Sequence, residues 1–261
     1  MNAQPFMIAV GGGKGGVGKS MVSCNLAVHY ALSGIRTTLS DLDFGAANVH
    51  TIFGLRNPER GLGDYFLSEK LSLSSLMIPT TIPALHLIPG SGFVPELANL
   101  DHRHKLRLLK DLKLLDVDLV LLDLGAGTSS NVIDFFALTH AGLVVTTPEP
   151  TSIVNAYEFI KNIVYRILFR LFKNEHEILN LIKETALQQN RYGIKSIDDL
   201  IVYLSKKHSW ASQMIQEVCE NLDFYLVLNQ AKKISEVDLG KKLYEISKKY
   251  LSVSLNFGGV I

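Results

Sequence analysis

Seven short apolar runs rich in β-branched residues recur along the chain, and segments whose apolar residues return every three or four positions separate most of them. The runs cover residues 6–10, 37–42, 85–88, 119–124, 143–147, 224–228 and 253–257. Strand and helix patterns that alternate in this way are typical of a parallel sheet covered by helices on both faces. The pattern therefore predicts an α/β fold with a doubly wound, mostly parallel sheet.

One segment departs from this alternation. Residues 165–221 have a mostly helical pattern and delay the next predicted strand by more than 50 residues. We interpret them as a helical insertion within a single domain that spans residues 1–261. The helix that leads into the segment carries one apolar stripe and one basic stripe, formed by Arg166, Arg170 and Lys173. Such a helix can dock on an anionic membrane or a partner helix, but packing on the sheet with a charged outer face is the simpler interpretation.

Length and composition narrow the class of protein. A chain of 261 residues that is 47% hydrophobic fits one large α/β domain, and a net charge of +1 gives no global reason to expect nucleic-acid binding. Cys24 and Cys219 lie far apart, which argues against a disulfide framework, a zinc site or an iron–sulfur site within one chain. No apolar run reaches the roughly 18 residues that span a bilayer. We therefore expect a cytoplasmic protein, with peripheral contact at the inner face of the membrane as the alternative.

The most informative motif directly follows the first apolar run. Residues 13–20 read G-K-G-G-V-G-K-S and match the phosphate-loop template G-x-x-x-x-G-K-[ST] at every position. Glycines let consecutive backbone N–H groups curl around phosphate oxygens, the lysine supplies positive charge, and the serine hydroxyl can bind Mg²⁺. The residues expected to hold the nucleotide are Gly13, Gly15, Gly16, Val17, Gly18, Lys19, Ser20 and Met21. An empty glycine-rich turn is disfavoured, because the motif lies between a predicted strand and a predicted helix.

Carboxylates end two of the predicted strands. Asp41 and Asp43 are two residues apart, so both can project to one face, and Asp123 closes the run at 119–124 as a Walker B acid would. In open α/β sheets ligands bind beyond the carboxyl ends of the strands. We therefore expect Mg²⁺ to be held by Ser20, Asp41 and Asp123. Solvated turn aspartates or a helix cap are the alternatives.

A basic cluster at residues 102–105, H-R-H-K, resembles a metal or phosphate patch only at first sight. Asp101 precedes it, and a helical pattern follows. We interpret the cluster as the solvated first turn of a helix that Asp101 caps.

Together the motifs resemble those of the MinD/ParA class of ATPases. They are K-G-G-V-G-K-S at 14–20, in which Lys14 marks the deviant Walker A subclass, D-L-D-F-G-A-A-N at 41–48, D-L-G-A-G at 123–127 and T-T-P-E-P-T-S at 146–152. Within the class, P-G-S-G-F at 89–93 and the motif that ends the run at 143–147 look most like the FlhG branch, which controls flagellar number and placement. The resemblance covers residues 6–164 and resumes over 222–261.

The resemblance implies a slow ATP-driven switch in which two ATP-bound subunits close face to face. Lys14 would reach the phosphates of the other subunit, Lys19 would bind phosphate, and Asp43 would orient the attacking water. Asp41 would support Mg²⁺, Asn48 would contact the nucleotide, and Asn229 would read the adenine edge. ATP, ADP and Mg²⁺ are the expected ligands.

The resemblance also implies a second copy of the chain and an activating protein of the flagellar or division machinery as partners. A ParA-like DNA-segregation ATPase is the alternative from the same fold, although the near-neutral charge weighs against it. A nucleotide-holding scaffold with little hydrolysis is a third interpretation, which the retained Asp41, Asp43 and Asp123 oppose. Only residues 1–5 precede the first strand, and the chain ends at Ile261 where relatives continue. We therefore expect the C-terminus to be truncated relative to them.

Overall fold

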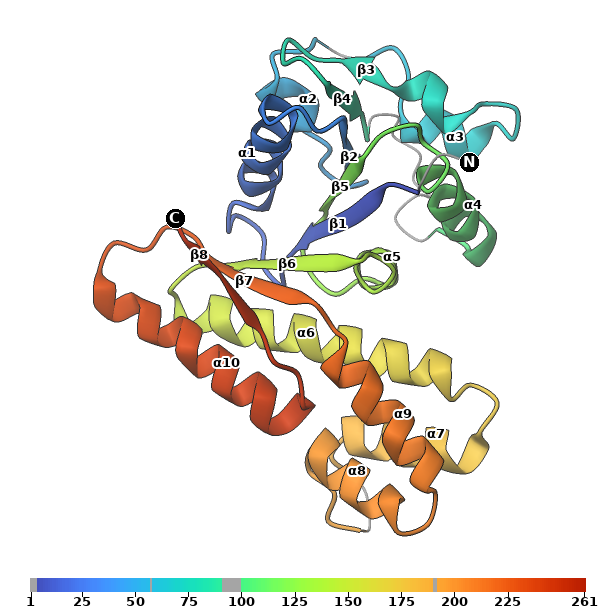
Figure 1. Ribbon diagram of the computed structural model, residues 1–261, viewed down its shortest axis with the longest axis vertical. Coiled ribbons are helices and arrows are strands. Elements are labelled where there is room, and N and C mark those ends of the chain that lie inside the picture. The colour runs from blue at the N-terminus through green and yellow to red at the C-terminus, as the bar shows by residue number, and fades with distance from the viewer. Residues whose placement is uncertain (1–3, 57, 91–99, 190–191) are drawn as a thin grey trace. The chain divides into compact units, whose positions relative to one another are not determined.

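A computed structural model describes residues 4–56, 58–90, 100–189 and 192–261 (Figure 1). The chain divides into two compact units, one up to Val145 and one from Thr146. Each unit is described by itself below. Part of the P-G-S-G-F motif, residues 91–93, lies outside the described residues.

The first unit alternates strands with helices along the chain. Its elements are β1 Phe6–Gly11, α1 Lys19–Leu32, β2 Thr37–Leu42, α2 Val49–Ile52, α3 Leu62–Leu67, η1 Leu73–Leu76, β3 Ile78–Pro79, β4 Leu85–Ile88, α4 His102–Leu112, β5 Leu119–Leu124, α5 Ser130–Phe136 and β6 Ala141–Thr146, which ends at the boundary. The strand β5 pairs in parallel with both β1 and β2. All six of its residues are buried, as expected of a central parallel strand with an unbroken apolar run.

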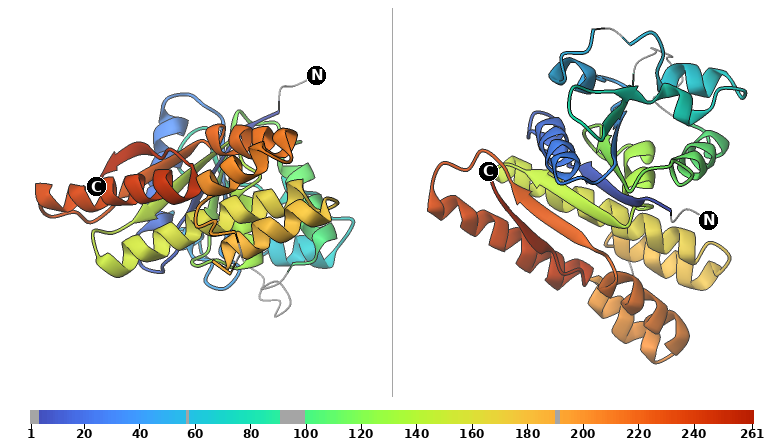
Figure 2. Two further views of the ribbon diagram at one scale, coloured as in Figure 1. Left: turned by 90° about the horizontal axis from the view of Figure 1, so that it is seen from below. Right: turned by 45° about the horizontal axis from the view of Figure 1, so that its top comes forward.

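The second unit is mainly helical. Its elements are α6 Pro150–Leu171, α7 His176–Ala186, α8 Ile197–Ser205, α9 Ser209–Glu220, β7 Phe224–Leu228, η3 Ile234–Glu236, α10 Val237–Leu251 and β8 Asn256–Val260. The strands β7 and β8 pair in parallel, with a register irregularity between Leu226 and Val227. Both views in Figure 2, like Figure 1, show α10 running along this pair. Among the described residues, no helix is long and apolar enough to cross a membrane.

The predicted fold class is confirmed. The strands follow the order β3-β4-β2-β5-β1-β6-β7-β8. β1 with β5 and β6, β2 with β4 and β5, and β7 with β8 pair in parallel, whereas β3 and β4 are antiparallel. Two details of the prediction were wrong. The two-residue strand β3, Ile78–Pro79, was missed, and the last strand begins at Asn256 rather than at residue 253. Val253 and Leu255 are buried, but they lie before the segment that pairs with β7.

The segment 165–221 contains the end of α6 and the whole of α7, α8 and α9. On the apolar stripe of α6, the side chains of Ile163, Val164 and Leu168 are fully buried. Leu171, on the same stripe, is exposed. That residues 1–261 form a single domain with 165–221 as an insertion stays a prediction.

The prediction for the basic cluster at residues 102–105, the first turn of α4, needs a correction. Asp101 caps the helix as predicted, since its carboxylate accepts a hydrogen bond from the His104 N–H at 2.8 Å. Lys105, however, is buried rather than solvated, and its Nζ lies 2.8 Å from Oδ2 of the equally buried Asp134 on α5. The prediction of a wholly solvated turn was therefore wrong at Lys105.

Candidate functional site

The phosphate loop leaves β1 and leads into α1, the helix that packs beside β1, β2 and β5 (Figure 1). Gly16 and Gly18 adopt left-handed backbone angles, φ 78° and φ 93°, which glycine reaches without steric cost. The carbonyl of Gly18 accepts the Val22 N–H at 3.0 Å and so begins the helix at Lys19. The free N–H groups and positive dipole end of a 14-residue helix therefore follow the loop directly, an arrangement that favours a bound phosphate.

Gly12 fixes the start of the loop, although it lies outside the template and sequence reasoning did not select it. A Cβ atom at Gly12 would lie 2.5 Å from the carbonyl oxygen of Val145 on β6. The Gly12 carbonyl also accepts the Gly127 N–H, at 3.2 Å, from the loop after β5. Only glycine fits this close approach of three backbone segments. Its position directly after a strand and before the motif was the available signal.

Lys19 and two acidic residues form the charged centre of the site. The Lys19 side chain is buried, and this burial lowers its pKa from the ordinary lysine value. The negative charges of Asp123 and Asp43 act in the opposite direction and raise that pKa. Because the Lys19 ammonium group is already buried beside charged neighbours, it can bind a phosphate without losing a full hydration shell.

Asp123 ends β5, where the strand register places it beside Asp41 of β2 and Val10 of β1. Its Oδ1 accepts a hydrogen bond from the Ser23 hydroxyl at 2.8 Å, whereas its Oδ2 is buried and has no partner among the described residues. Burial raises the pKa of Asp123, and hydrogen bonds from Ser20 and Ser23 partly offset the rise. A buried carboxylate oxygen without a partner fits a site that receives a cation.

Ser23 was not selected from the sequence. It lies four residues after Lys19 on α1 and is completely buried. Its hydroxyl is the group that orients Asp123, because it reaches the carboxylate from the helix that also carries Lys19 and Ser20. A small polar residue one helical turn after the template lysine was the only signal for it.

Asp41 is almost fully buried, and both of its carboxylate oxygens accept backbone N–H groups. Oδ1 accepts from Asp43 and Oδ2 accepts from Val49, each at 3.1 Å. Burial raises the pKa of Asp41 to about 7. These contacts hold the loop between β2 and α2 in place, so the structure gives Asp41 a shaping role in addition to the predicted support of Mg²⁺.

Asp43 lies half-buried in the same loop. Its Oδ1 accepts the N–H groups of Gly45, at 3.3 Å, and Ala46, at 3.1 Å. A Cβ atom at Gly125 would lie 3.2 Å from this oxygen, so the loop after Asp123 passes directly beside Asp43. No described residue donates a hydrogen bond to the second oxygen, Oδ2, which stays available for a water molecule.

Four further predicted residues lie in four different places. Lys14 is half-buried within the loop, Met21 is 55% exposed on α1, and Asn48 is exposed at the position before α2. Asn229 belongs to the second unit. It follows β7, where its N–H donates to the Thr146 carbonyl at 2.8 Å and its Oδ1 accepts the Gln230 N–H at 2.9 Å. Its assignment to the adenine edge stays a prediction.

The residues present fit a magnesium nucleotide better than a metal bound by protein alone. Among the described residues, no group of three or more histidine, cysteine or acidic side chains could hold a metal ion. Mg²⁺ commonly needs only one or two protein carboxylates when phosphates and waters complete its shell. The hydroxyl of Ser20, the unpartnered oxygen of Asp123 and the glycine loop match that requirement.

Comparison with known families agrees with this geometry. A family model described as ParA, NUBPL iron-transfer P-loop NTPase, matches residues 5–168. The antiactivator FleN of Pseudomonas aeruginosa is 31% identical over 71% of this chain and 69% of its own length. The flagellum site-determining protein YlxH of Helicobacter pylori is 33% identical over 59% of this chain. The chain spans about half the length of that protein, 52%.

Solved structures resemble the whole chain in fold. The septum site-determining protein MinD of Pyrococcus horikoshii, complexed with Mg-ADP, has a TM-score of 0.63, covering 98% of this chain and 81% of its own at 17% identity. A plasmid partition protein of Borrelia burgdorferi, bound to AMPPNP, has a TM-score of 0.60, covering 99% of this chain and 85% of its own at 18% identity. At such identities the likeness supports the fold.

Proposed function

Because the chain belongs to the ParA/MinD family of P-loop NTPases, we propose that it is an ATP-binding, slowly hydrolysing switch that regulates the position or number of a cellular structure. The observation that carries the proposal is the meeting of the glycine loop, the buried Lys19 and the unpartnered oxygen of Asp123 in one unit. These groups supply a phosphate cradle, a cation for phosphate charge and a carboxylate for Mg²⁺.

Within this proposal each residue has a stated task. The backbone N–H groups of residues 13–21 bind phosphate oxygens, and Lys19 neutralises their charge. Ser20 and Asp123 would hold Mg²⁺, which would offset phosphate charge, and Asp41 would support the same site. Asp43 orients the attacking water through its second oxygen while backbone N–H groups fix the first.

We propose further that ATP joins two copies of the chain. Lys14 then contacts phosphates bound by the other copy, so that phosphate charge holds the dimer together and hydrolysis releases it. Asn48 and Asn229 are assigned to the nucleotide on the same basis. This part rests on the family resemblance and on the placement of Lys14 in the loop.

The biological role follows the names of the relatives. FleN is an antiactivator, YlxH determines the flagellum site, and MinD determines the septum site. A solved complex joins MinC and MinD of Aquifex aeolicus. We therefore assign to this chain a cytoplasmic switch whose activating partner belongs to the flagellar or division machinery, with contact at the inner face of the membrane as a further expectation.

DNA binding is the second candidate function. Residues 231–251 carry six lysines against three acidic residues, and a plasmid partition protein shares the fold. Contact with DNA phosphates through these lysines would weaken steeply as salt rises. A titration of duplex DNA at 50 and 200 mM salt separates the two functions, because the switch proposed above predicts no saturable DNA binding at either concentration.

Light scattering tests the proposed switch. The mass of the protein is measured in Mg²⁺ with ADP or with ATP, using Asp43→Asn to slow hydrolysis because asparagine keeps the oxygen that accepts Gly45 and Ala46. We expect a monomer in ADP and a dimer in ATP, and we expect Lys14→Ala to abolish the dimer while the exposed Lys113→Ala does not. A mass that is the same in ADP and in ATP would rule out the ATP-dependent dimer.

A further inference from the structure

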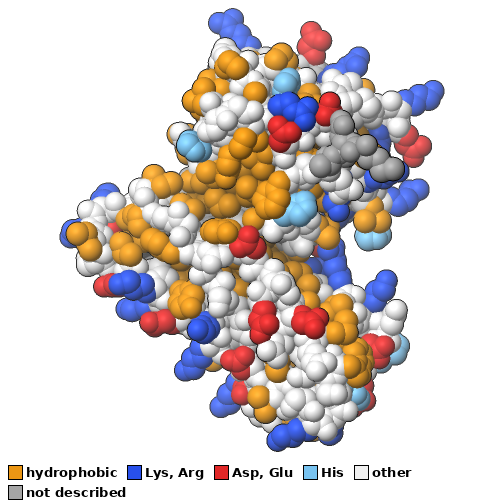
Figure 3. Space-filling model, viewed as in Figure 1, with side chains coloured by type: hydrophobic (Ala, Val, Ile, Leu, Met, Phe, Trp, Pro, Cys, Tyr) orange, Lys and Arg blue, Asp and Glu red, His pale blue; other side chains and the backbone are white. Residues whose placement is uncertain are grey.

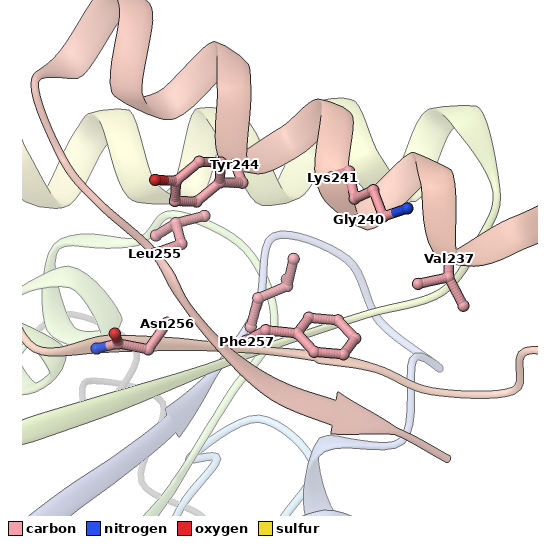
Figure 4. A pocket seen from close by; sticks show the side chains of 8 residues that line it. Val237, Gly240, Lys241, Tyr244, Leu255, Asn256 and Phe257 are labelled. Atoms are coloured by element: carbon pink, nitrogen blue, oxygen red, sulfur yellow. The ribbon is translucent and has the colours of Figure 1, made fainter.

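An apolar pocket of about 300 Å³ lies between α10 and the β7–β8 pair of the second unit. Figure 4 shows Val237 and Tyr244 on α10 facing Leu255, which lies just before β8, and Phe257, which lies on β8. Leu226 of β7 and Gly240 of α10 complete the apolar lining. Its volume suits one or two large apolar side chains and lies at the lower limit for small-molecule sites.

The surface around the pocket is unusually apolar for an exposed face. Phe257 is 57% exposed, Ile261 is 63% exposed and Ile234, just before α10, is 92% exposed. In Figure 3 hydrophobic side chains and lysines lie next to one another on the part of the surface that α10 and β8 occupy in Figure 1. Contiguous apolar surface of this kind with a polar rim is typical of a docking site.

Gly240 keeps the pocket open at a cost to the helix. Glycine in a helix interior is less stable than alanine. A Cβ atom at Gly240 would lie 3.6 Å from Leu226 Cδ2 and 3.9 Å from Phe257 Cε2, which are ordinary contacts. Sterics therefore do not require glycine here, and a larger side chain would extend into the pocket.

The charged side chains around the pocket indicate which kind of partner would bind there. Lys241 lines it and pairs with Asp238, Nζ to Oδ1 at 3.1 Å, and Nζ of Lys248 lies 5.9 Å from the ring centroid of Tyr244. Glu236 accepts the backbone N–H groups of Lys232 and Lys233, and both lysines are exposed. Residues 231–251 carry six lysines against three acidic residues, so their net positive charge complements carboxylates on a partner.

We propose that this α10–β8 surface docks an acidic amphipathic helix of a partner protein. One or two apolar side chains of that helix enter the pocket, and its carboxylates face the lysines of α10. The proposal uses no residue assigned to the nucleotide, since Asn229, which belongs to the same unit, does not line the pocket. It adds a partner surface to the switch and does not depend on the ATP-driven dimer.

The probe is a synthetic 16-residue helical peptide with leucines at positions i, i+3, i+4 and i+7 and glutamates elsewhere. It is titrated into the full chain by nuclear magnetic resonance, beside a peptide with lysines in place of the glutamates. We expect saturable shifts at Tyr244 and Phe257 with the acidic peptide alone. Lys241→Glu should weaken its binding about tenfold, whereas Lys110→Glu on α4, equally exposed, should not.

A second experiment uses variants of Gly240 whose side chains fill the pocket. Gly240→Leu should abolish peptide binding, and Gly240→Ala should reduce it without lowering the melting temperature, which separates loss of the pocket from loss of the fold. Binding that survives both substitutions would overturn the proposal. The proposal would also be overturned if the acidic peptide produced no shifts and phosphatidylglycerol vesicles, duplex DNA or a second copy of the chain produced them instead. ATP binding, measured on the same samples, reports separately on the proposed switch.

Discussion

Replacing Ser23 by alanine removes the hydrogen bond that orients Asp123. The Ser23 hydroxyl lies 2.8 Å from Asp123 Oδ1 at a fully buried position, where no bulk water can replace it. A hydrogen bond to a charged group contributes about 1.5–3 kcal/mol. The substitution also stabilises helix α1 by about 0.5 kcal/mol, because alanine has a higher helix propensity than serine. We therefore expect the free energy of unfolding to fall by about 1–2.5 kcal/mol, without nucleotide.

In Ser23→Ala, we expect the affinity for Mg²⁺ to fall and the affinity for the nucleotide itself to stay the same. Loss of a group that orients a metal ligand typically costs about 10- to 100-fold in metal affinity. The loop backbone and Lys19 are untouched, so affinity for ATP without Mg²⁺ should stay the same. The assay is calorimetric titration of ATP with and without Mg²⁺, combined with urea unfolding.

Ser33→Ala is the matched control. Ser33 follows the same helix α1 and is exposed, and within the described part of the chain its hydroxyl donates only to the His29 carbonyl. Its replacement should change the free energy of unfolding by less than about 0.5 kcal/mol. If Ser23→Ala behaves like Ser33→Ala in both assays, or weakens ATP binding equally with and without Mg²⁺, the orienting role of Ser23 is refuted.

Three further predictions concern packing and charge. Lys105→Met removes the ammonium group that offsets the charge of the buried Asp134 carboxylate and should lower the free energy of unfolding, measured in urea, by about 3–5 kcal/mol, whereas the double variant with Asp134→Leu should recover most of that loss. Gly12→Ala brings a Cβ within 2.5 Å of the Val145 carbonyl and should lower the melting temperature and abolish ATP binding; a variant that melts and binds like the parent would contradict the close approach. Burial raises the pKa of Asp41 to about 7, above its ordinary 3.8, so the folded state holds a proton that the unfolded state releases. In the absence of nucleotide and Mg²⁺, the free energy of unfolding should therefore fall as pH rises from about 4 to about 7. In Asp41→Ala, the same rise in pH should lower the free energy of unfolding by less.

The strands that build the site were predictable because their apolar runs are long and nearly unbroken. β1, β2 and β5 lie in the centre of the sheet, and burial on both faces produces such a run. β3 was not predictable, since two residues that include Pro79 carry no periodic signal. The last strand was misplaced because Gly258 and Gly259 hide its pairing segment.

The site residues divide in the same way. Template positions such as Lys19 and Ser20 were found because a sequence motif specifies them, and their roles stay predictions. Ser23 and Gly12 act through contacts with residues that lie 100 or more positions away, namely Asp123 and Val145. A single sequence does not reveal such contacts.

The buried Lys105 illustrates the same limit. Its sequence neighbours are basic and polar, and they predict a solvated turn. The partner that draws it inward, Asp134, lies 29 residues later on another helix. Burial of a charge is decided by tertiary packing, and a local pattern does not report it.

The central claim is that the loop at residues 13–20 binds a magnesium nucleotide. Calorimetric titration of ATP into the protein, with Mg²⁺, tests it most directly when the parent is compared with Lys19→Ala and with Lys113→Ala, an exposed lysine of the same unit. We expect one ATP per chain for the parent and for Lys113→Ala, and loss of binding in Lys19→Ala. An absence of ATP binding by the folded parent, or binding that Lys19→Ala leaves unchanged, would show that this loop is not a nucleotide site.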